Sequence, residues 1–194
     1  MKLPLMRTFL AYVEDRPGVL NRVTSLFRRR GYNIESLTVG RTERPGVSRL
    51  TLVMGADDDD ARRLEANLYK LVNVLWVEDV SHAQTVVRDL ALIKVRAMPE
   101  QRAQVMQLCD VYRGQVVDIG PEAMIVEITG TQDKLDGLLE VLRPFGIVEM
   151  VRTGAIAMTR NETAAQSARP AGLTSSASGT RGTDGTSGDE EAAA

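Results

Sequence analysis

Apolar and polar positions over the first 80 residues change their period in a regular order. Runs of apolar or alternating residues predict strands over residues 7–13, 33–41, 48–54 and 74–80. After the first strand, helical spacing of apolar residues predicts a helix that buries Val19, Leu20, Val23, Leu26 and Phe27. Gly31 is placed to end this helix in a left-handed conformation. A second helix is predicted after the acidic run 57–60, and its buried stripe consists of Ala61, Leu64, Leu68 and Leu71.

Residues 89–153 repeat this order. Strands are predicted over residues 89–97, 115–119, 124–129 and 147–153. The first helix of this half begins near Pro99, is expected to end at Gly114, and buries Val105, Leu108, Cys109 and Tyr112. The second helix is expected to be capped by Thr131 and ended by Pro144 and Gly146, with a buried stripe of Leu135, Leu138, Leu139 and Leu142.

The order β-α-β-β-α-β is that of the ferredoxin-like arrangement, an antiparallel sheet with both helices on one face. We therefore predict an α+β protein with two consecutive ferredoxin-like domains, residues 1–81 and 82–160. The other face of each sheet carries no helix, and we expect apolar residues such as Val39 and Val77 on it. Such a face has to be covered by another sheet or another chain, which favours an oligomer.

Residues 161–194 differ in composition from the two domains. From about Glu162 onward, Ala, Gly, Ser and Thr dominate, and Leu173 is the only large aliphatic residue. A segment of this kind buries too little apolar surface to offset its ordering entropy, so we predict a disordered tail.

Composition narrows the function classes. The chain has 194 residues, 43% of them hydrophobic, and a net charge of −2, which disfavours nucleic acid or an anionic membrane as a partner. It contains no apolar run long enough to span a bilayer and no signal-peptide core, so we expect a cytoplasmic protein. One His and one Cys leave little material for a metal site or a catalytic triad, and catalysis is not expected.

The most informative chemistry lies between the first strand and the first helix, in residues 15–20 (DRPGVL). Gly18 lets a ligand approach the backbone closely, and the free N–H groups of a helix start bind anions such as a carboxylate. Asp15 adds an acceptor for an ammonium group, and Asn33 supplies both a donor and an acceptor. These groups suit a free α-amino acid. The same residues also fit a plain helix cap at Asp15, a Pro-Gly turn, and an Asn33 that bonds nearby backbone.

Longer stretches of the chain carry a family resemblance. Residues 14–23 (EDRPGVLNRV) and 26–39 (LFRRRGYNIESLTV) resemble the N-terminal ACT domain of the regulatory (small) subunits of acetolactate synthase, also called acetohydroxyacid synthase. The resemblance covers about residues 6–160 and continues through residues 48–51, 70–74, 113–118, 130–136 and 151–154. GYNIES at 31–36 combined with RGQ at 113–115 is specific to that family, whereas Asp-x-Pro-Gly-x-Leu is shared by ACT domains generally.

The resemblance implies a non-catalytic regulatory subunit. Its partner would be a catalytic large subunit that condenses two pyruvates to acetolactate in branched-chain amino-acid biosynthesis. This chain would raise the activity of that subunit and confer feedback inhibition by valine. No cofactor and no metal are implied for this chain, whereas thiamine diphosphate, Mg and FAD are implied for the catalytic partner.

The resemblance also implies an effector site and a homodimer. Carried over by position, the valine site comprises Asp15, Gly18 and Asn33, with the backbone N–H groups of Val19 and Leu20 near the valine carboxylate. The site is expected at the interface of two ACT domains, where the neighbouring chain completes it. Many relatives carry Asn at the position of Asp15.

Three other function classes compete with this one. An RNA-binding sheet would present aromatic residues on its central strands, and SRLTLVM at 48–54 has none. An acylphosphatase-like enzyme would need an Arg-lined phosphate cradle, which Arg16 alone does not provide. The main alternative is an ACT-type amino-acid sensor that regulates a different biosynthetic enzyme or a transcription factor.

Four further features of the sequence, at His82, Cys109, Trp76 and the run Arg28 to Arg30, have a structural interpretation. His82 is expected to be a linker residue and Cys109 a packed core thiol. The run Arg28 to Arg30 fits either an acidic partner surface or simple complementation of the helix dipole. Trp76 is expected in core or dimer packing.

Overall fold

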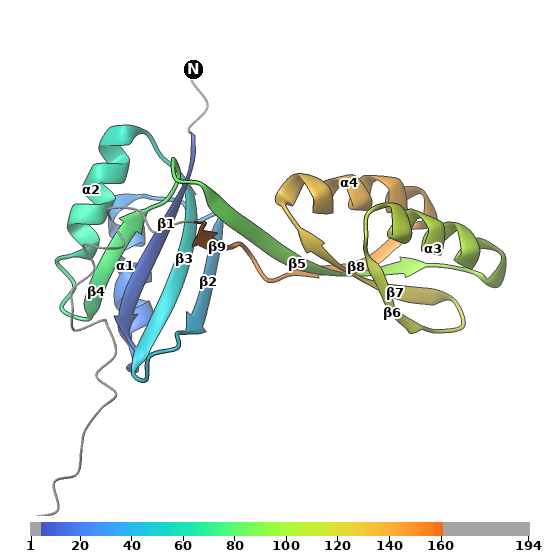
Figure 1. Ribbon diagram of the computed structural model, residues 1–194, viewed down its shortest axis with the longest axis horizontal. Helices are drawn as coiled ribbons and strands as arrows, with labels where there is room; N and C mark the ends of the chain where they lie inside the picture. Colours follow the sequence, from blue (N-terminus) through green and yellow to red (C-terminus); the bar gives the residue numbers. More distant parts are fainter. Residues whose placement is uncertain (1–4, 161–194) are drawn as a thin grey trace, which may run out of the picture.

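The computed structural model describes residues 5–160, which form two α+β domains joined end to end (Figure 1). The N-terminal domain contains β1 (Met6–Glu14), α1 (Val19–Arg30), β2 (Ser36–Arg41), β3 (Val47–Gly55), α2 (Asp58–Leu68) and β4 (Val74–Asp79). The C-terminal domain contains β5 (Thr85–Arg96), α3 (Arg102–Val111), β6 (Gln115–Ile119), β7 (Ala123–Gly130), α4 (Gln132–Leu142), β8 (Ile147–Arg152) and β9 (Ile156–Thr159). The predicted tail lies outside the described residues.

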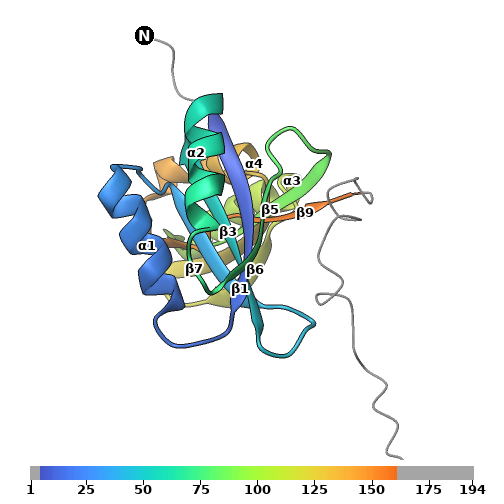
Figure 2. The same ribbon diagram turned by 90° about the vertical axis from the view of Figure 1, so that its left-hand side faces the viewer.

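Both domains confirm the predicted β-α-β-β-α-β order. The N-terminal sheet has the strand order β2-β3-β1-β4, and the C-terminal sheet has the order β6-β7-β5-β8. All strand pairs are antiparallel. The two helices of each domain lie on one face of its sheet, as the views along and across the long axis show (Figures 1 and 2).

Alternation along the central strands produces the two main cores. In the N-terminal domain, every second residue of β1 and β3 faces the helices, and Phe9, Ala11, Leu50 and Leu52 are fully or almost fully buried. In the C-terminal domain the equivalent buried residues of β5, β7 and α4 are Ala91, Ile93, Val95, Met124, Val126, Ile128, Leu135, Leu138 and Leu142. For these strands and for α4, the periods in the sequence therefore identify the core face correctly.

The ends of the helices agree with the predictions only in part. Gly31 ends α1 in the left-handed conformation, with φ of 70°. At the end of α3, however, the left-handed residue is Arg113, with φ of 52°, and not Gly114. Gly114 is needed for a different reason, because a Cβ there would lie 3.2 Å from the carbonyl oxygen of Glu127. Thr131 occupies the N-cap position of α4, but its side chain makes no capping hydrogen bond.

The open face of the N-terminal sheet is partly covered by the chain itself. The predicted strand begins at residue 89, but β5 begins at Thr85, and residues 85–88 pair with β9, a strand that the sequence does not predict. Ala157 of β9 packs with Leu10 and Val80 into a third, small core on that face. β9 therefore supplies part of the cover that an oligomer was expected to provide.

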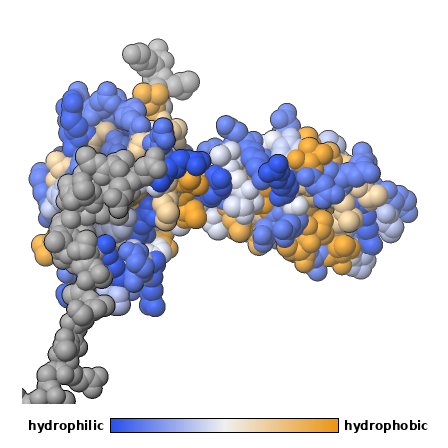
Figure 3. Space-filling model, viewed as in Figure 1, coloured by the Kyte–Doolittle hydropathy of each residue, from blue (hydrophilic) through white to orange (hydrophobic). Residues whose placement is uncertain are grey.

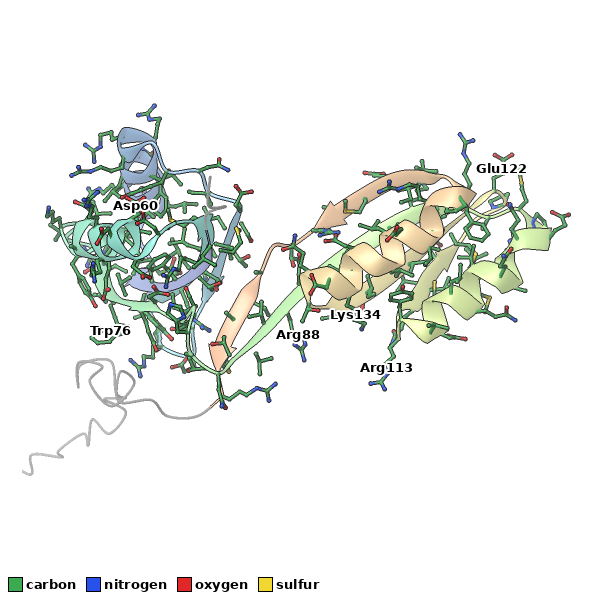
Figure 4. The ribbon with its side chains drawn as sticks, turned by 90° about the horizontal axis from the view of Figure 1, so that it is seen from above. Asp60, Trp76, Arg88, Arg113, Glu122 and Lys134 are labelled. Atoms are coloured by element: carbon green, nitrogen blue, oxygen red, sulfur yellow. The ribbon has the colours of Figure 1, made fainter. Side chains whose placement is uncertain are left out.

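Val39 and Val77, which we expected on the open face, both lie on the face that the helices cover. Val77 is 1% exposed and belongs to the core beneath the helices. Val39 pairs with Leu50, a residue of the same core, so it points to the helix-bearing face, where it is 45% exposed at the edge of the sheet. Trp76 pairs with Tyr12 on the open face and is half-buried (Figure 4).

Side-chain hydrogen bonds join the two domains. The backbone N–H of Ala155 donates to Ser36 Oγ at 2.9 Å, and Thr38 Oγ1 donates to the carbonyl oxygen of Thr153 at 3.4 Å. The Arg49 guanidinium donates to the carbonyl oxygen of Ala157 and lies over the Tyr12 ring. The segment between β8 and β9 therefore attaches the C-terminal domain to the open face of the N-terminal sheet.

Candidate effector site at the start of helix α1

The connection between β1 and α1 forms a turn that opens toward solvent. The N–H of Asp15 donates to the carbonyl oxygen of Gly46 at 2.8 Å, which fixes the first residue of the turn against the β2–β3 connection. Gly18 is the N-cap of α1 and has φ of 83°, a left-handed conformation that an L-residue adopts only with strain. No atom lies within 4 Å of the position that a Cβ on Gly18 would take. Gly18 therefore adopts this left-handed conformation without strain, and it leaves open space where a side chain would lie.

The first turn of α1 presents unpaired N–H groups at this opening. No side chain caps the helix, and the N–H of Val19 makes one long bond, 3.4 Å, to the carbonyl oxygen of Arg16. Among the described residues, the N–H groups of Leu20 and Asn21 have no acceptor. Unpaired N–H groups at a helix N-terminus favour an anion such as a carboxylate. The side chain of Leu20 is 43% exposed, so it borders the opening and is not part of the buried stripe.

The carboxylate of Asp15 lies beside this opening and does not cap the helix. Its Oδ2 is 3.3 Å from Nε of Arg41, the last residue of β2. The Asp15 side chain is 39% exposed and that of Arg41 is 87% exposed, so the pair is accessible to solvent and contributes little to stability. Asp15 is therefore available as an acceptor for a ligand ammonium group. Arg41 is a neighbour of the site that sequence reasoning missed, because nothing in the local pattern shows that the end of β2 lies beside residue 15.

Asn33 lies at the other end of the domain. It follows α1, a helix of 12 residues whose length is about 18 Å. Its Nδ2 donates to Oε1 of Glu35, and the N–H of Glu35 donates to the carbonyl oxygen of Val53, near the end of β3. Asp15, in contrast, lies beside the start of β3. The structure thus brings together Asp15, Gly18, Val19 and Leu20, and it separates Asn33 from them within one chain.

Other potentially reactive side chains are buried or paired within the fold. Arg7 is 3% exposed, contacts His82 Nε2 and Asp58, and lies 3.6 Å from Asp79. Burial raises the pKa of the Cys109 thiol to about 11, which makes it a poor nucleophile. Within residues 5–160, no group of three or more His, Cys, Asp and Glu side chains is placed to hold a metal ion. No helix in this range is long and apolar enough to cross a membrane.

Two family models match the chain, one in each of the two domains. Residues 9–76 match the model of the acetohydroxyacid synthase small subunit-like ACT domain. Residues 88–161 match the model described as the small subunit of acetolactate synthase.

Individual relatives cover nearly the whole described region. The chain is 46% identical over 151 residues to the probable acetolactate synthase small subunit of Methanothermobacter thermautotrophicus, covering 77% of this chain and 90% of the relative. It is 45% identical over 157 residues to the acetolactate synthase small subunit of Mycobacterium bovis, covering 81% and 94%. The crystal structure of the acetolactate synthase small subunit from Thermotoga maritima superposes with a TM-score of 0.76 at 37% identity, covering 82% of this chain and 99% of that one. The chain therefore belongs to the acetolactate synthase small subunit family.

Proposed function

We propose that this chain is a non-catalytic regulatory subunit that activates a catalytic large subunit of acetolactate synthase and makes it sensitive to valine. Family membership supports the partner, because a small subunit implies a large one. The open start of α1 supports the effector. Unpaired N–H groups, a left-handed Gly18 and the Asp15 carboxylate offer binding groups for both charges of a free amino acid.

The position of Asn33 supports a two-fold dimer. β2 is an edge strand, and residues Val39 to Arg41 at its end are exposed. Antiparallel pairing of two β2 edges around a two-fold axis would set the start of one β2 against the end of the other. Asn33 precedes the start of β2. Arg41, at the end of β2, forms an ion pair with Asp15. In such a dimer, Asn33 of a second copy would therefore lie beside Asp15 and Gly18, and each dimer would contain two complete valine sites.

The linkage between the site and the large subunit follows from the dimer. Valine inhibits only if it binds one arrangement of the regulatory dimer more tightly than another, and a difference of about 1–3 kcal/mol corresponds to a 5- to 150-fold ratio of the two affinities. The C-terminal domain is the candidate for part of the contact with the large subunit. Val117 and Ile119 of β6 and Val148 and Val151 of β8 are exposed there, and hydrophobic patches are visible on the C-terminal domain in the space-filling view (Figure 3).

Reconstitution tests this function. The large subunit from the same source is assayed for acetolactate formation alone, with this chain, and with this chain plus L-valine. We expect this chain to raise the rate and valine to lower it again. Replacing Gly18 with Asp should abolish the valine effect and leave the activation, because the change acts at the amino-acid site. If this chain neither activates the large subunit nor makes it valine-sensitive, it regulates a different enzyme or a transcription factor.

A further inference from the structure

A cavity of about 590 Å³ lies between the two domains, remote from the start of α1. Its walls come from the starts of β1 and β2 in the N-terminal domain. From the C-terminal domain they come from β5, the β7–α4 junction and the segment after β8. Two of the hydrogen bonds that join the domains border it, the one that Ser36 Oγ accepts and the one that the carbonyl oxygen of Thr153 accepts. A volume in this range is typical of small-molecule binding sites, which often lie at domain interfaces.

One side of the cavity offers groups for an anion. Arg152, the last residue of β8, lines the cavity, and Asp136 orients it by accepting from Nη2. Its Nε is buried and has no acceptor among the described residues. Gln132, in the first turn of α4, also lines the cavity, and the start of α4 faces the N-terminal domain, as the position of Lys134 shows (Figure 4). The guanidinium and the positive end of the helix dipole together favour a carboxylate.

The neighbouring wall offers groups for a cation. Asp89 of β5 accepts through Oδ1 from Thr153 Oγ1 at 2.9 Å and from the N–H of Gly154 at 3.0 Å. Within residues 5–160, no group donates to its Oδ2, so this oxygen is available to a ligand. Glu35, an exposed residue whose Oε1 accepts from Asn33 Nδ2, lines the opposite wall, in the N-terminal domain. Neither carboxylate takes part in an ion pair among the described residues, so both favour an ammonium group.

The strand register places the two charges at the right spacing. Arg152 pairs with Ala91, and Asp89 lies two residues before Ala91 on the same face of β5. Asp89 and Arg152 are therefore diagonal neighbours, with their backbones about 7–8 Å apart. That distance leaves room between the two side chains for the carboxylate and the ammonium group of one α-carbon.

Apolar side chains complete the cavity. Met6 and Val53 of the N-terminal domain and Val87 of β5 line it. We propose that this cavity is a second amino-acid site, which binds an α-amino acid with an aliphatic side chain through Arg152 and Asp89. A nucleotide or another polyanion would be repelled by Asp89 and Glu35, and a divalent metal would find no cluster of three ligands within residues 5–160. Because the walls belong to both domains, the bound amino acid stabilises their contact.

The binding test uses the full chain with Gly18 replaced by Asp, so that amino-acid binding at the start of α1 does not contribute to the signal. Isothermal titration calorimetry with L-leucine should show one site per chain. 4-Methylpentanoate lacks the ammonium group of leucine and 3-methylbutylamine lacks its carboxylate, and each should bind at least tenfold more weakly. In the same background, Asp89→Asn and Arg152→Gln should each weaken L-leucine binding at least tenfold. Glu149→Gln, an exposed change on the other face of β8, should have no effect.

Amide chemical shifts provide a readout that needs no cavity variant. L-Leucine should shift the N–H signals of Gly130 and Gly154 in the Gly18→Asp chain. Absence of heat and of these shifts overturns the proposal, as does equal binding by the Asp89→Asn and Glu149→Gln chains. The two sites are distinguishable: if Gly18→Asp leaves all binding unchanged and Asp89→Asn removes it, the cavity is the only amino-acid site and the proposed α1 site is wrong.

Discussion

Replacing Gly18 with Asp is expected to weaken valine binding strongly at a modest cost to folding. The folding cost comes from the left-handed backbone, since no atom lies within 4 Å of the new Cβ. Left-handed conformations cost an L-residue about 1–2 kcal/mol. For a domain of this size, that loss lowers Tm by roughly 5–15 °C, which leaves the chain folded at 25 °C.

The binding cost comes from the added charge. The new carboxylate would lie about 5 Å from the carboxylate of a valine held by the N–H groups of α1, a repulsion of about 3 kcal/mol at an effective dielectric constant of 20. Salt and the partial exposure of the site reduce this repulsion, so we expect about 1–3 kcal/mol, or a 5- to 150-fold rise in the Kd for valine. Gly18→Ala introduces the strain and a methyl group without the charge, and it should weaken binding less.

Calorimetry on the isolated chain measures this effect directly. Gly146→Asp is a control that adds the same charge elsewhere, because Gly146 also has a positive φ, 94°, with ψ of 103°, and ordinary packing around its Cβ position, but lies in the C-terminal domain. It should lower Tm at least as much, because this backbone conformation is less accessible to an L-residue than αL, and it should leave the Kd for valine unchanged. Equal Kd values for the Gly18→Asp and Gly146→Asp chains would refute the assignment of the valine carboxylate to the start of α1.

Three further predictions concern other parts of the chain. Cys109, with its pKa raised to about 11 by burial, should resist iodoacetamide at pH 8 in the folded chain and react once urea unfolds it; rapid native labelling would contradict its burial. Burial and the nearby Asp79 raise the pKa of Glu65, so its charge destabilises the fold above that pKa. Glu65→Gln should therefore raise Tm at pH 7 and lose this gain below about pH 4, where both states are protonated; a gain that is independent of pH would exclude this cause. Gly154→Ala should lower Tm, because its Cβ would lie 2.7 Å from Ser36 Oγ at a φ of 86°; an unchanged Tm would show that the domain junction is looser than described.

The sequence predicted the two domains because their signals are local. The alternation of Phe9 and Ala11 in β1 and the leucines of α4 report which face of each element is buried. β9 escaped prediction because it has four residues and derives its stability from pairing with residues 85–88, about 70 positions earlier. Val77 was misplaced because the alternation of a strand defines two faces without saying which one the helices cover.

The candidate site was predicted as a set of residues but not as a geometry. Asp15, Gly18 and the start of α1 are adjacent in sequence, so their proximity follows from the turn alone. Arg41 beside Asp15 depends on the register of the N-terminal sheet, which the sequence does not reveal. The separation of Asn33 from Gly18 depends on the length of α1, so the family pattern groups residues that lie at opposite ends of this helix in one chain.

A mixing experiment tests the two-chain site most directly. In an Asp89→Asn background, which removes binding in the cavity between the domains, chains carrying Gly18→Asp and chains carrying Asn33→Ala should each bind valine poorly, because every α1 site in either homodimer has one defect. After unfolding and refolding together in equal amounts, half of the dimers contain one chain of each kind. Each mixed dimer should have one intact site, formed by Gly18 of one chain and Asn33 of the other, so calorimetry should recover about a quarter of the normal number of sites with normal Kd. If the mixture binds no more valine than the separate variants, the site does not join Gly18 and Asn33 of different chains.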